Sequence, residues 1–579
     1  MRGMVPATSL STLCGDTLPP DDLQRRFARR GWRPVFWALS RIASWICNDG
    51  GRESQKLQQL RRALIDELSR GTRLERAFSQ QVSSSAAFPP AHESAIYFLQ
   101  SLALMYGSSD DHAVMSDGEL AFLLIAANDY VFGWREADER ELARTERLVA
   151  ECGRTMLYNR RRDPVAGFVR GASILEMLPR RTPRWQTDAA WTALQQRAFG
   201  TSLAEYVESF SGPLVITSEG WESDALHDGT RGPVLDTQAW TELCPLPEEN
   251  VQAYWDSLIT NRDDARDLLL EAAIGHDGLP IGATVFFRTP FVRFDERRAV
   301  PASPWVVRDH LRFGLWNLMR VAAAEEEGRR HSKDWTPAFG DLVEQWCQRI
   351  AKLASESPRF VGQVIADHPD ADEIEDVVVV QNRRVALFSV KGGVVREDLL
   401  RGAGCRSRVV DFYDRFFFAE RTKKYRGGAV RLLEEKVTKI RSGAYEPRVD
   451  RHARIYTVIV TYDDLGTDTP GGYDYLQRRA NSLGLLQAAR VAPVVSMPVD
   501  SFETLLGYCA KGGRLFDVLR QKGTGRWATG SLENLLHEIS GSSRHQLPQV
   551  DAEFEARTHR SQDRLVAELQ RQRDAGEEE

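Results

Sequence analysis

Two apolar runs joined by a short polar turn place the tightest constraint on how this chain folds. DVVVV ends at residue 380, and RVALFSVK begins at residue 384. Runs this rich in β-branched residues, with so short a connection, predict an antiparallel hairpin. If the turn centres between Asn382 and Arg383, directly opposed residues have a constant sum of positions, which places Asp376 opposite Ser389.

The alternation of side chains along a strand then predicts which residues share a face. Lys391 lies two residues beyond Ser389, so its side chain is expected on the same face as Asp376. Glu375 is expected to face away with Val390, unless a bulge or a register slip moves it. Asp376 is therefore the first candidate acid, and Glu375 is the reserve.

The segments around the hairpin predict a layered α/β unit. A helical stripe precedes it, formed by Phe339, Leu342, Val343, Trp346, Ile350 and Leu353. FVGQVI at 360–365 predicts a strand before the hairpin, and YTVIVTY at 456–462 predicts a buried strand after it. RVAPVVSMPVDSFETLLGY at 490–508 predicts a strand and then a helix, with Asp500 and Glu503 in the pattern of a capping box.

These elements resemble the PD-(D/E)XK nucleases, the restriction-endonuclease-like superfamily. The resemblance is carried by GDLVEQW around Glu344, by Asp376 before VVVV, and by the tripeptide Ser389-Val390-Lys391. It implies a core of one helix and a three-stranded meander, within a central mixed sheet flanked by helices. It also implies Mg²⁺-dependent or Mn²⁺-dependent hydrolysis of phosphodiester bonds, in DNA more than in RNA, and the family's habits suggest bacterial anti-phage defence.

The same resemblance implies roles for individual residues. Asp376 would be the main ligand of the divalent cation, with Glu344 and Glu375 as further candidate ligands. Lys391 would orient the attacking water or the phosphate. Other interpretations stay open, because a lysine at a strand end also extends into solvent and a helical Glu344 is also found solvated.

Ser389 departs from the family pattern, which has Glu or Asp at this position. A hydroxyl is a neutral ligand and binds a hard cation more weakly than a carboxylate does. Glu344 or the loop acids Asp370, Asp372 and Glu373 would then supply the missing charge. The alternative hypothesis is a catalytically inactive nuclease fold that serves as a nucleic-acid-binding or protein-interaction module.

The charge of the chain restricts how nucleic acid could bind. The formal net charge is -6, so attraction of a polyanion requires a local basic surface. Basic residues outnumber acids between 396 and 450, and RTKKYRGG at 421–428 is the predicted backbone-contacting segment. Its candidate residues are Arg421, Lys423, Lys424 and Arg426.

The length of 579 residues predicts several domains, because one hydrophobic core does not grow to this size. The predicted units are an N-terminal helical region (1–82), a helical domain (91–205), a mixed α/β connecting region (206–335), the nuclease-like domain (336–515), and a C-terminal helical extension with a charged tail (516–579). In the connecting region, GATVFFRTPFVRF at 282–294 predicts strands.

Cysteine use and hydropathy predict a cytoplasmic location. The seven cysteines are scattered and lack CxxC spacing, which argues against a zinc ribbon or a disulfide framework. No run approaches the ~18 apolar residues of a membrane span. No membrane partner is therefore expected, whereas the N-terminal half is a candidate surface for a homo-oligomer or a protein partner.

Overall fold

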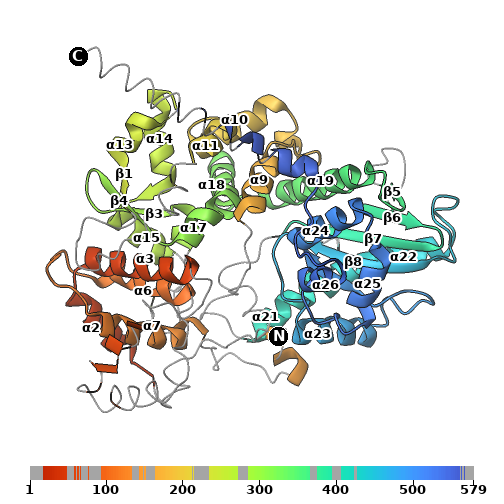
Figure 1. The fold of residues 1–579 in the computed structure, drawn as a ribbon, viewed down its shortest axis with the longest axis horizontal. Helices are drawn as coiled ribbons and strands as arrows, with labels where there is room; N and C mark the ends of the chain where they lie inside the picture. Colours follow the sequence, from red (N-terminus) through yellow and green to blue (C-terminus); the bar gives the residue numbers. More distant parts are fainter. Residues whose placement is uncertain are drawn as a thin grey trace.

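The computed structural model describes residues 17–48, 93–132, 164–210, 234–244, 246–271, 284–365, 374–393, 406–422 and 427–553, with single residues and short stretches elsewhere. These residues form a mixed α/β protein with two sheets. Figure 1 shows the first helices and the larger sheet at opposite ends of the molecule. No helix among the described residues is both long enough and apolar enough to cross a bilayer.

The N-terminal helices pack around their own apolar core. They are α2 (Pro20–Ala28), α3 (Trp32–Asn48), α6 (Glu93–Tyr106) and α7 (Asp117–Phe132). The central helices α6 and α7 are apolar on nearly every side, so their side chains are buried against α2 and α3 and they form an interior. Trp32 and Phe36 of α3 face the other way and pack against Phe286 and Phe294.

The middle of the chain combines short helices with a small mixed sheet. Its helices are α9 (Pro164–Leu175), η2 (Pro183–Trp185), α10 (Asp188–Phe199), α11 (Leu203–Ser209), α13 (Thr237–Leu243), α14 (Glu248–Leu258), α15 (Arg262–Glu271), α16 (Thr284–Arg288), α17 (Pro304–Asp309), η3 (His310–Gly314) and α18 (Leu315–Glu326). Its strands are β1 (Leu235–Asp236), β2 (Ile259–Thr260), β3 (Phe291–Arg293) and β4 (Arg298–Pro301), in the order β1-β4-β3-β2.

The strand predicted over residues 282–294 is correct only in its second part. Phe291–Arg293 is β3, but Thr284–Arg288 is the helix α16, so the prediction is wrong there. Pro290 separates the two, and its fixed φ suits the bend between them. Because α16 buries Val285 and Phe286 while Thr289 bonds the carbonyl of Val285, tertiary packing overrides the β-branched and aromatic preference for strand.

The C-terminal part contains the larger sheet. Its helices are α19 (Trp335–Ser355), α21 (Arg406–Tyr413), η4 (Asp414–Phe418), α22 (Ala429–Arg441), α23 (Pro470–Ser482), α24 (Val499–Ala510), α25 (Leu515–Thr524) and α26 (Leu532–Ser540). Its strands are β5 (Gln363–Ile365), β6 (Val377–Gln381), β7 (Arg384–Lys391), β8 (Arg454–Thr461) and β9 (Val495–Pro498), which lie in the sheet in chain order.

The β6–β7 hairpin has the register predicted from the sequence. Gln381 pairs with Arg384 and Val377 pairs with Phe388, so opposed positions keep the expected constant sum. Strands β5, β6 and β7 form an antiparallel meander, whereas β8 and β9 run parallel to β7. The pairing extends to the end of β7, where Lys391 pairs with Thr461.

The two faces of this sheet are covered by different helices. Val377, Phe388 and Val458 belong to the core that α19 and α24 share with the middle of the chain. Val378, Leu387 and Ile459 face the other way, into the core formed with α21, η4, α22 and α23. The odd-numbered positions of β7, which include Ser389 and Lys391, thus lie on the α22 side.

A buried arginine joins the middle of the chain to the sheet. Arg170 of α9 is 1% exposed and contacts both acids at the start of α24, Asp500 and Glu503. Its guanidinium donates two hydrogen bonds to Glu503, at 2.6 and 2.7 Å, and the Trp346 indole donates a third at 2.6 Å. Burial alone lowers the pKa of Arg170, but the charges of Asp500 and Glu503 outweigh it and hold the pKa above its usual value.

This arrangement corrects the predicted role of Asp500 and Glu503. Pro498 is the N-cap of α24 and makes no side-chain cap hydrogen bond, so the predicted capping box is wrong. The three-residue spacing that suits a capping box also places Asp500 and Glu503 on one face of the helix, where both meet Arg170.

Replacing Arg170 with alanine should strongly destabilise the protein. The change leaves Glu503, whose side chain is only 16% exposed, without its charge partner, and breaking a buried pair in this way costs about 3–5 kcal/mol. Urea unfolding followed by tryptophan fluorescence measures the loss. Arg478→Ala is the matched control, because its pair with Asp474 is exposed and is expected to contribute less than about 1 kcal/mol. Equal losses in the two variants would contradict the assigned role of the buried pair.

Candidate functional site

The candidate site lies at the end of the hairpin that is remote from the turn. β6 begins at Val377, so Asp376 and Glu375 lie just before the strand, where the backbone bends. The carboxylate of Asp376 accepts a hydrogen bond from the Val390 backbone N–H at 2.6 Å. In a continuing antiparallel ladder, the Val390 N–H would donate to a backbone carbonyl of the neighbouring strand. Here the Asp376 side chain accepts this hydrogen bond instead.

Different charged groups act on the residues around the bend. The charges of Lys391 and of Lys436, on α22, both act on the Glu375 carboxyl group. Asp376 instead acts electrostatically on Cys347, which is buried on α19. The orientation of Glu375 relative to Lys391 stays a prediction, because strict alternation ends where the ladder ends.

Glu375 has an unusual environment for a carboxyl group. Burial, and next the charge of Asp376, raise the pKa of Glu375 to about 8, although Lys391 and Lys436 oppose the shift. Its Oε1 atom accepts a weak hydrogen bond from the Asp376 N–H at 3.3 Å. Its Oε2 atom is buried and has no hydrogen-bond partner among the described residues. An oxygen of this kind is an available ligand for a cation or a proton.

Ser389 is fully buried at the place of the missing acid. Its exposure is 0%, and its Oγ atom also lacks a hydrogen-bond partner within the described part of the chain. It pairs with Ile459 in β8, two residues before Lys391 in the direction of the site. The site therefore combines two carboxyl groups, one unbonded hydroxyl and one lysine around the last residues of β7.

Glu344 lies near this group but is bonded elsewhere. Both carboxylate oxygens accept hydrogen bonds from the Arg181 guanidinium, each at 2.7 Å. Gln348 donates to Glu344 at 3.4 Å and to the Asp376 carbonyl at 3.2 Å, so it links the helix to the bend. Glu344 is thus placed to position the bend through Gln348, with its own charge balanced by Arg181.

The segment that carries Arg181 is fixed to the same helix. The carboxylate of Asp341 accepts hydrogen bonds from the backbone N–H groups of Arg180 and Arg181. Asp341 is 4% exposed, so these bonds are buried. No local pattern predicts this contact, since 160 and 161 positions separate the partners. Lys436 was likewise recognised only as one of many basic residues between 396 and 450.

Several predicted residues lie away from the site or outside the described residues. Arg421 is exposed, with its side chain 3.7 Å from that of Glu435. Lys423, Lys424 and Arg426 lie outside the described residues, as do the loop acids Asp370, Asp372 and Glu373. No group of three or more acidic, histidine or cysteine side chains in the described part of the chain is arranged to hold a metal ion.

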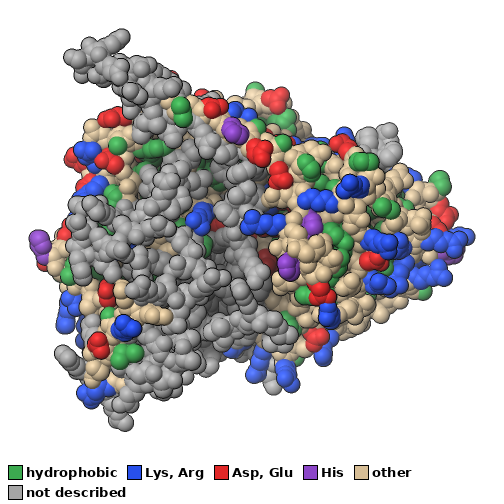
Figure 2. Space-filling view, viewed as in Figure 1, with side chains coloured by type: hydrophobic (Ala, Val, Ile, Leu, Met, Phe, Trp, Pro, Cys, Tyr) green, Lys and Arg blue, Asp and Glu red, His purple; other side chains and the backbone are tan. Residues whose placement is uncertain are grey.

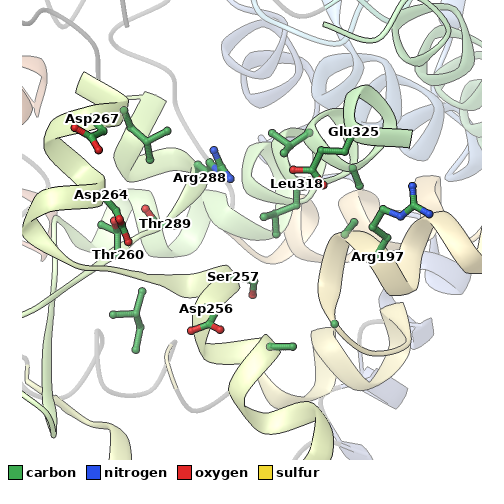
Figure 3. Close-up of a pocket in the computed structure, with 17 residues that line it drawn as sticks. Arg197, Asp256, Ser257, Thr260, Asp264, Asp267, Arg288, Thr289, Leu318 and Glu325 are labelled. Atoms are coloured by element: carbon green, nitrogen blue, oxygen red, sulfur yellow. The ribbon is translucent and has the colours of Figure 1, made fainter. Parts of the chain in front are cut away.

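A polar cavity of about 560 Å³ lies elsewhere, between α10, α14, α15, α16 and α18. Figure 3 shows the side chains of Arg288, Glu325 and Asp256 on different helices around this cavity. The hydroxyls of Ser257 and Thr289 are bonded to backbone carbonyls of their own helices, at 2.6 and 3.0 Å. The cavity therefore has a charged wall, but these two hydroxyls are already engaged within the protein.

Comparison with protein-family models, with curated proteins and with solved structures finds no match to this chain.

The raised pKa of Glu375 predicts how stability depends on pH in a metal-free buffer. Between its unfolded value near 4.5 and its folded value of about 8, the folded protein holds a proton that the unfolded chain has released. Stability should therefore fall as the pH rises through this range. Glu375→Gln should remove this fall. At pH 8.5, the free energy of unfolding of the variant should exceed that of wild type by at least about 1.4 kcal/mol, the equivalent of one pKa unit.

Urea unfolding at about pH 5.5 and at about pH 8.5 in EDTA measures this difference. Glu420→Gln is the control, because the Glu420 side chain is 79% exposed and should show no such dependence. If the difference in free energy of unfolding between Glu375→Gln and wild type is the same at the two pH values, the raised pKa assigned to Glu375 is contradicted.

Proposed function

We propose that this protein is a divalent-metal-dependent nuclease that hydrolyses phosphodiester bonds in DNA. The observation that carries the proposal is the pair of neighbouring carboxyl groups, Glu375 and Asp376, at the end of the hairpin, where the charge of Lys391 acts on Glu375. The surrounding fold supports it. α19 precedes the antiparallel meander β5-β6-β7, and β8 then pairs parallel to β7, as expected for a restriction-endonuclease-like domain.

The residues present fit a magnesium ion. Mg²⁺ is commonly held by one or two carboxylates and keeps several waters, so it does not require a cage of protein ligands. Glu375 and Asp376 would hold it, and the buried, unbonded Oε2 of Glu375 is the free ligand atom. When bound, such a cation supplies a water that is nucleophilic at neutral pH and neutralises charge on the phosphate oxygens.

The remaining steps belong to the side chains of the chain itself. Lys391 places a positive charge where a non-bridging phosphate oxygen becomes more negative in the transition state. The Val390 N–H fixes the rotamer of Asp376, and Gln348 fixes its carbonyl, so the acid is oriented before substrate binds. Lys436 contributes a second positive charge from α22 and favours the ionised form of Glu375.

Cleavage of DNA in Mg²⁺ or Mn²⁺ tests the proposal. Wild type should cut at least one of plasmid, linear duplex and single-stranded DNA. Asp376→Ala and Lys391→Ala should each lower the rate by about 100-fold or more, because each removes a charge that acts in the transition state. Lys352→Ala, an exposed change on α19, should leave the rate unaltered. Undiminished cutting by both site variants would rule out the assignment.

A second function is favoured by Ser389 and by the bonding of Glu344. Serine takes the position of an acid, and Arg181 balances the charge of Glu344. Both features lower the negative charge available to a cation. We propose as the alternative that the domain binds nucleic acid through the same fold without hydrolysing it.

Ser389→Asp distinguishes the two functions. In the alternative, wild type binds duplex DNA but leaves every substrate intact, and its melting temperature does not respond to Mn²⁺. The new carboxylate should destabilise the metal-free protein, because it is buried beside Glu375, and Mn²⁺ should then raise the melting temperature by several degrees. Ser389→Ala should show no such response. Cleavage by wild type, or a wild-type melting temperature that already rises with Mn²⁺, would exclude the alternative.

A further inference from the structure

Three arginines lie side by side at the end of the sheet opposite the candidate site. Arg383 is in the β6–β7 turn, and its carbonyl accepts the backbone N–H of Arg454 at 2.7 Å. The next residue along β8, Ile455, donates its N–H to the carbonyl of Arg490 at 2.9 Å. Backbone pairing thus holds Arg383, Arg454 and Arg490 in a row across the strand ends.

Two further arginines extend this row. Arg441, at the end of α22, bonds the carbonyls of Arg451, Ala453 and Ala489. Burial, and then the charge of Arg490, lower the pKa of Arg441, which shows that the two guanidinium groups are close. Arg451 has a side chain that is 53% exposed. We call Arg383, Arg441, Arg451, Arg454 and Arg490 the arginine row.

The acids beside the arginine row do not balance its charge. Asp450 lies 3.6 Å from Arg383, and Glu446 lies 3.8 Å from Arg451. Five arginines therefore face these two carboxylates in a protein whose formal net charge is -6. Figure 2 shows Lys and Arg side chains gathered at the end of the molecule where Figure 1 places the sheet and α22. Arg383 is 83% exposed, so the row is open to a ligand.

We propose that the arginine row binds the phosphate backbone of nucleic acid, as a contact separate from the candidate hydrolytic site. The inference rests on the proposed function only for the class of ligand. Guanidinium groups are planar and donate paired hydrogen bonds that match phosphate oxygens, which lysine does not. The neighbouring strand ends bring these arginines together at one end of the sheet. Arg441 donates to three backbone carbonyls and forms no ion pair with a carboxylate of the described residues, although the charge of Asp450 also acts on it.

The distance between the two sites sets a length requirement. β7 runs from Arg384 to Lys391, and seven steps along a strand cover roughly 23 Å. A duplex rises about 3.4 Å per base pair, so nucleic acid must extend about seven base pairs beyond the scissile phosphate to reach the row. Binding of long duplexes should depend on the row, whereas cleavage of short ones should not.

The test compares two triple variants in EDTA, using the full chain and a fluorescent duplex of about 30 base pairs, longer than the span between the sites. One variant is Arg383→Gln, Arg451→Gln, Arg454→Gln. The matched control is Arg25→Gln, Arg297→Gln, Arg298→Gln, which removes three exposed, ion-paired arginines from α2 and β4. Fluorescence anisotropy at about 50 to 200 mM KCl gives the affinity and its salt slope.

The row variant should bind the duplex about 10- to 100-fold more weakly and lower the salt slope by about two to three, one unit for each lost phosphate contact. The control variant should match wild type, and both should keep the wild-type melting temperature. Equal affinity and slope in the row variant and wild type would overturn the proposal. So would competition by poly-glutamate as strong as that by DNA at equal charge, since the row would then serve an acidic protein.

Cleavage separates this proposal from the hydrolytic one. A DNA hairpin with a stem of about six base pairs is too short to reach from Lys391 to the row. The row variant should cut it at the wild-type rate. If wild type cuts no substrate but the row variant binds the duplex more weakly than wild type, the arginine row is supported as a binding site and the hydrolytic function is contradicted. If wild type cuts DNA and the row variant binds the duplex with wild-type affinity, the hydrolytic function is supported and the arginine row is contradicted as a binding site.

Discussion

The hydrogen bond from the Val390 N–H to the Asp376 carboxylate is the interaction on which the candidate site depends. The β6–β7 ladder ends at the pair Val377–Phe388, because beyond it the Asp376 side chain accepts the hydrogen bond that a backbone carbonyl would accept in a longer strand. Released from strand alternation, Glu375 comes under the charges of Lys391 and Lys436. The cost is a carboxyl group buried beside a second one, which raises its pKa, so a cation bound there would displace its proton.

Long-range ion pairs make this site part of the whole molecule. Arg170 and Arg181 come from the middle of the chain, yet they balance Glu503 and Glu344, which lie on the two helices that cover one face of the sheet. Without these arginines, both acids would be largely buried charges that no positive charge balances at close range, which a folded protein tolerates poorly. The sheet and its covering helices are therefore stabilised by residues outside the predicted 336–515 unit, and the site is positioned from both sides.

The sequence was sufficient for the parts of the fold that local rules control. The register of the hairpin followed from one turn, because pairing along a ladder repeats until something interrupts it. The interruption at Asp376 was not predictable, since it depends on which oxygen reaches the Val390 N–H. Asp500 and Glu503 show the same limit, because their spacing fits a capping box and only the approach of Arg170 gives them another role. Local patterns determine elements, whereas contacts across hundreds of positions determine the chemistry.

The distribution of charge makes the proposed binding of a polyanion compatible with an acidic chain. At physiological ionic strength, exposed charges are screened beyond about 8 Å, so the net charge of -6 acts weakly on a ligand that touches one end of the sheet. The local charge at this end comes from Arg383, Arg454 and Arg490, whose backbones are held beside one another by the strand pairing. The same strand β7 carries Lys391 at its other end. Because a strand is rigid over this length, it fixes the distance between the two positive positions, and a backbone that follows the strand meets both in a constant register.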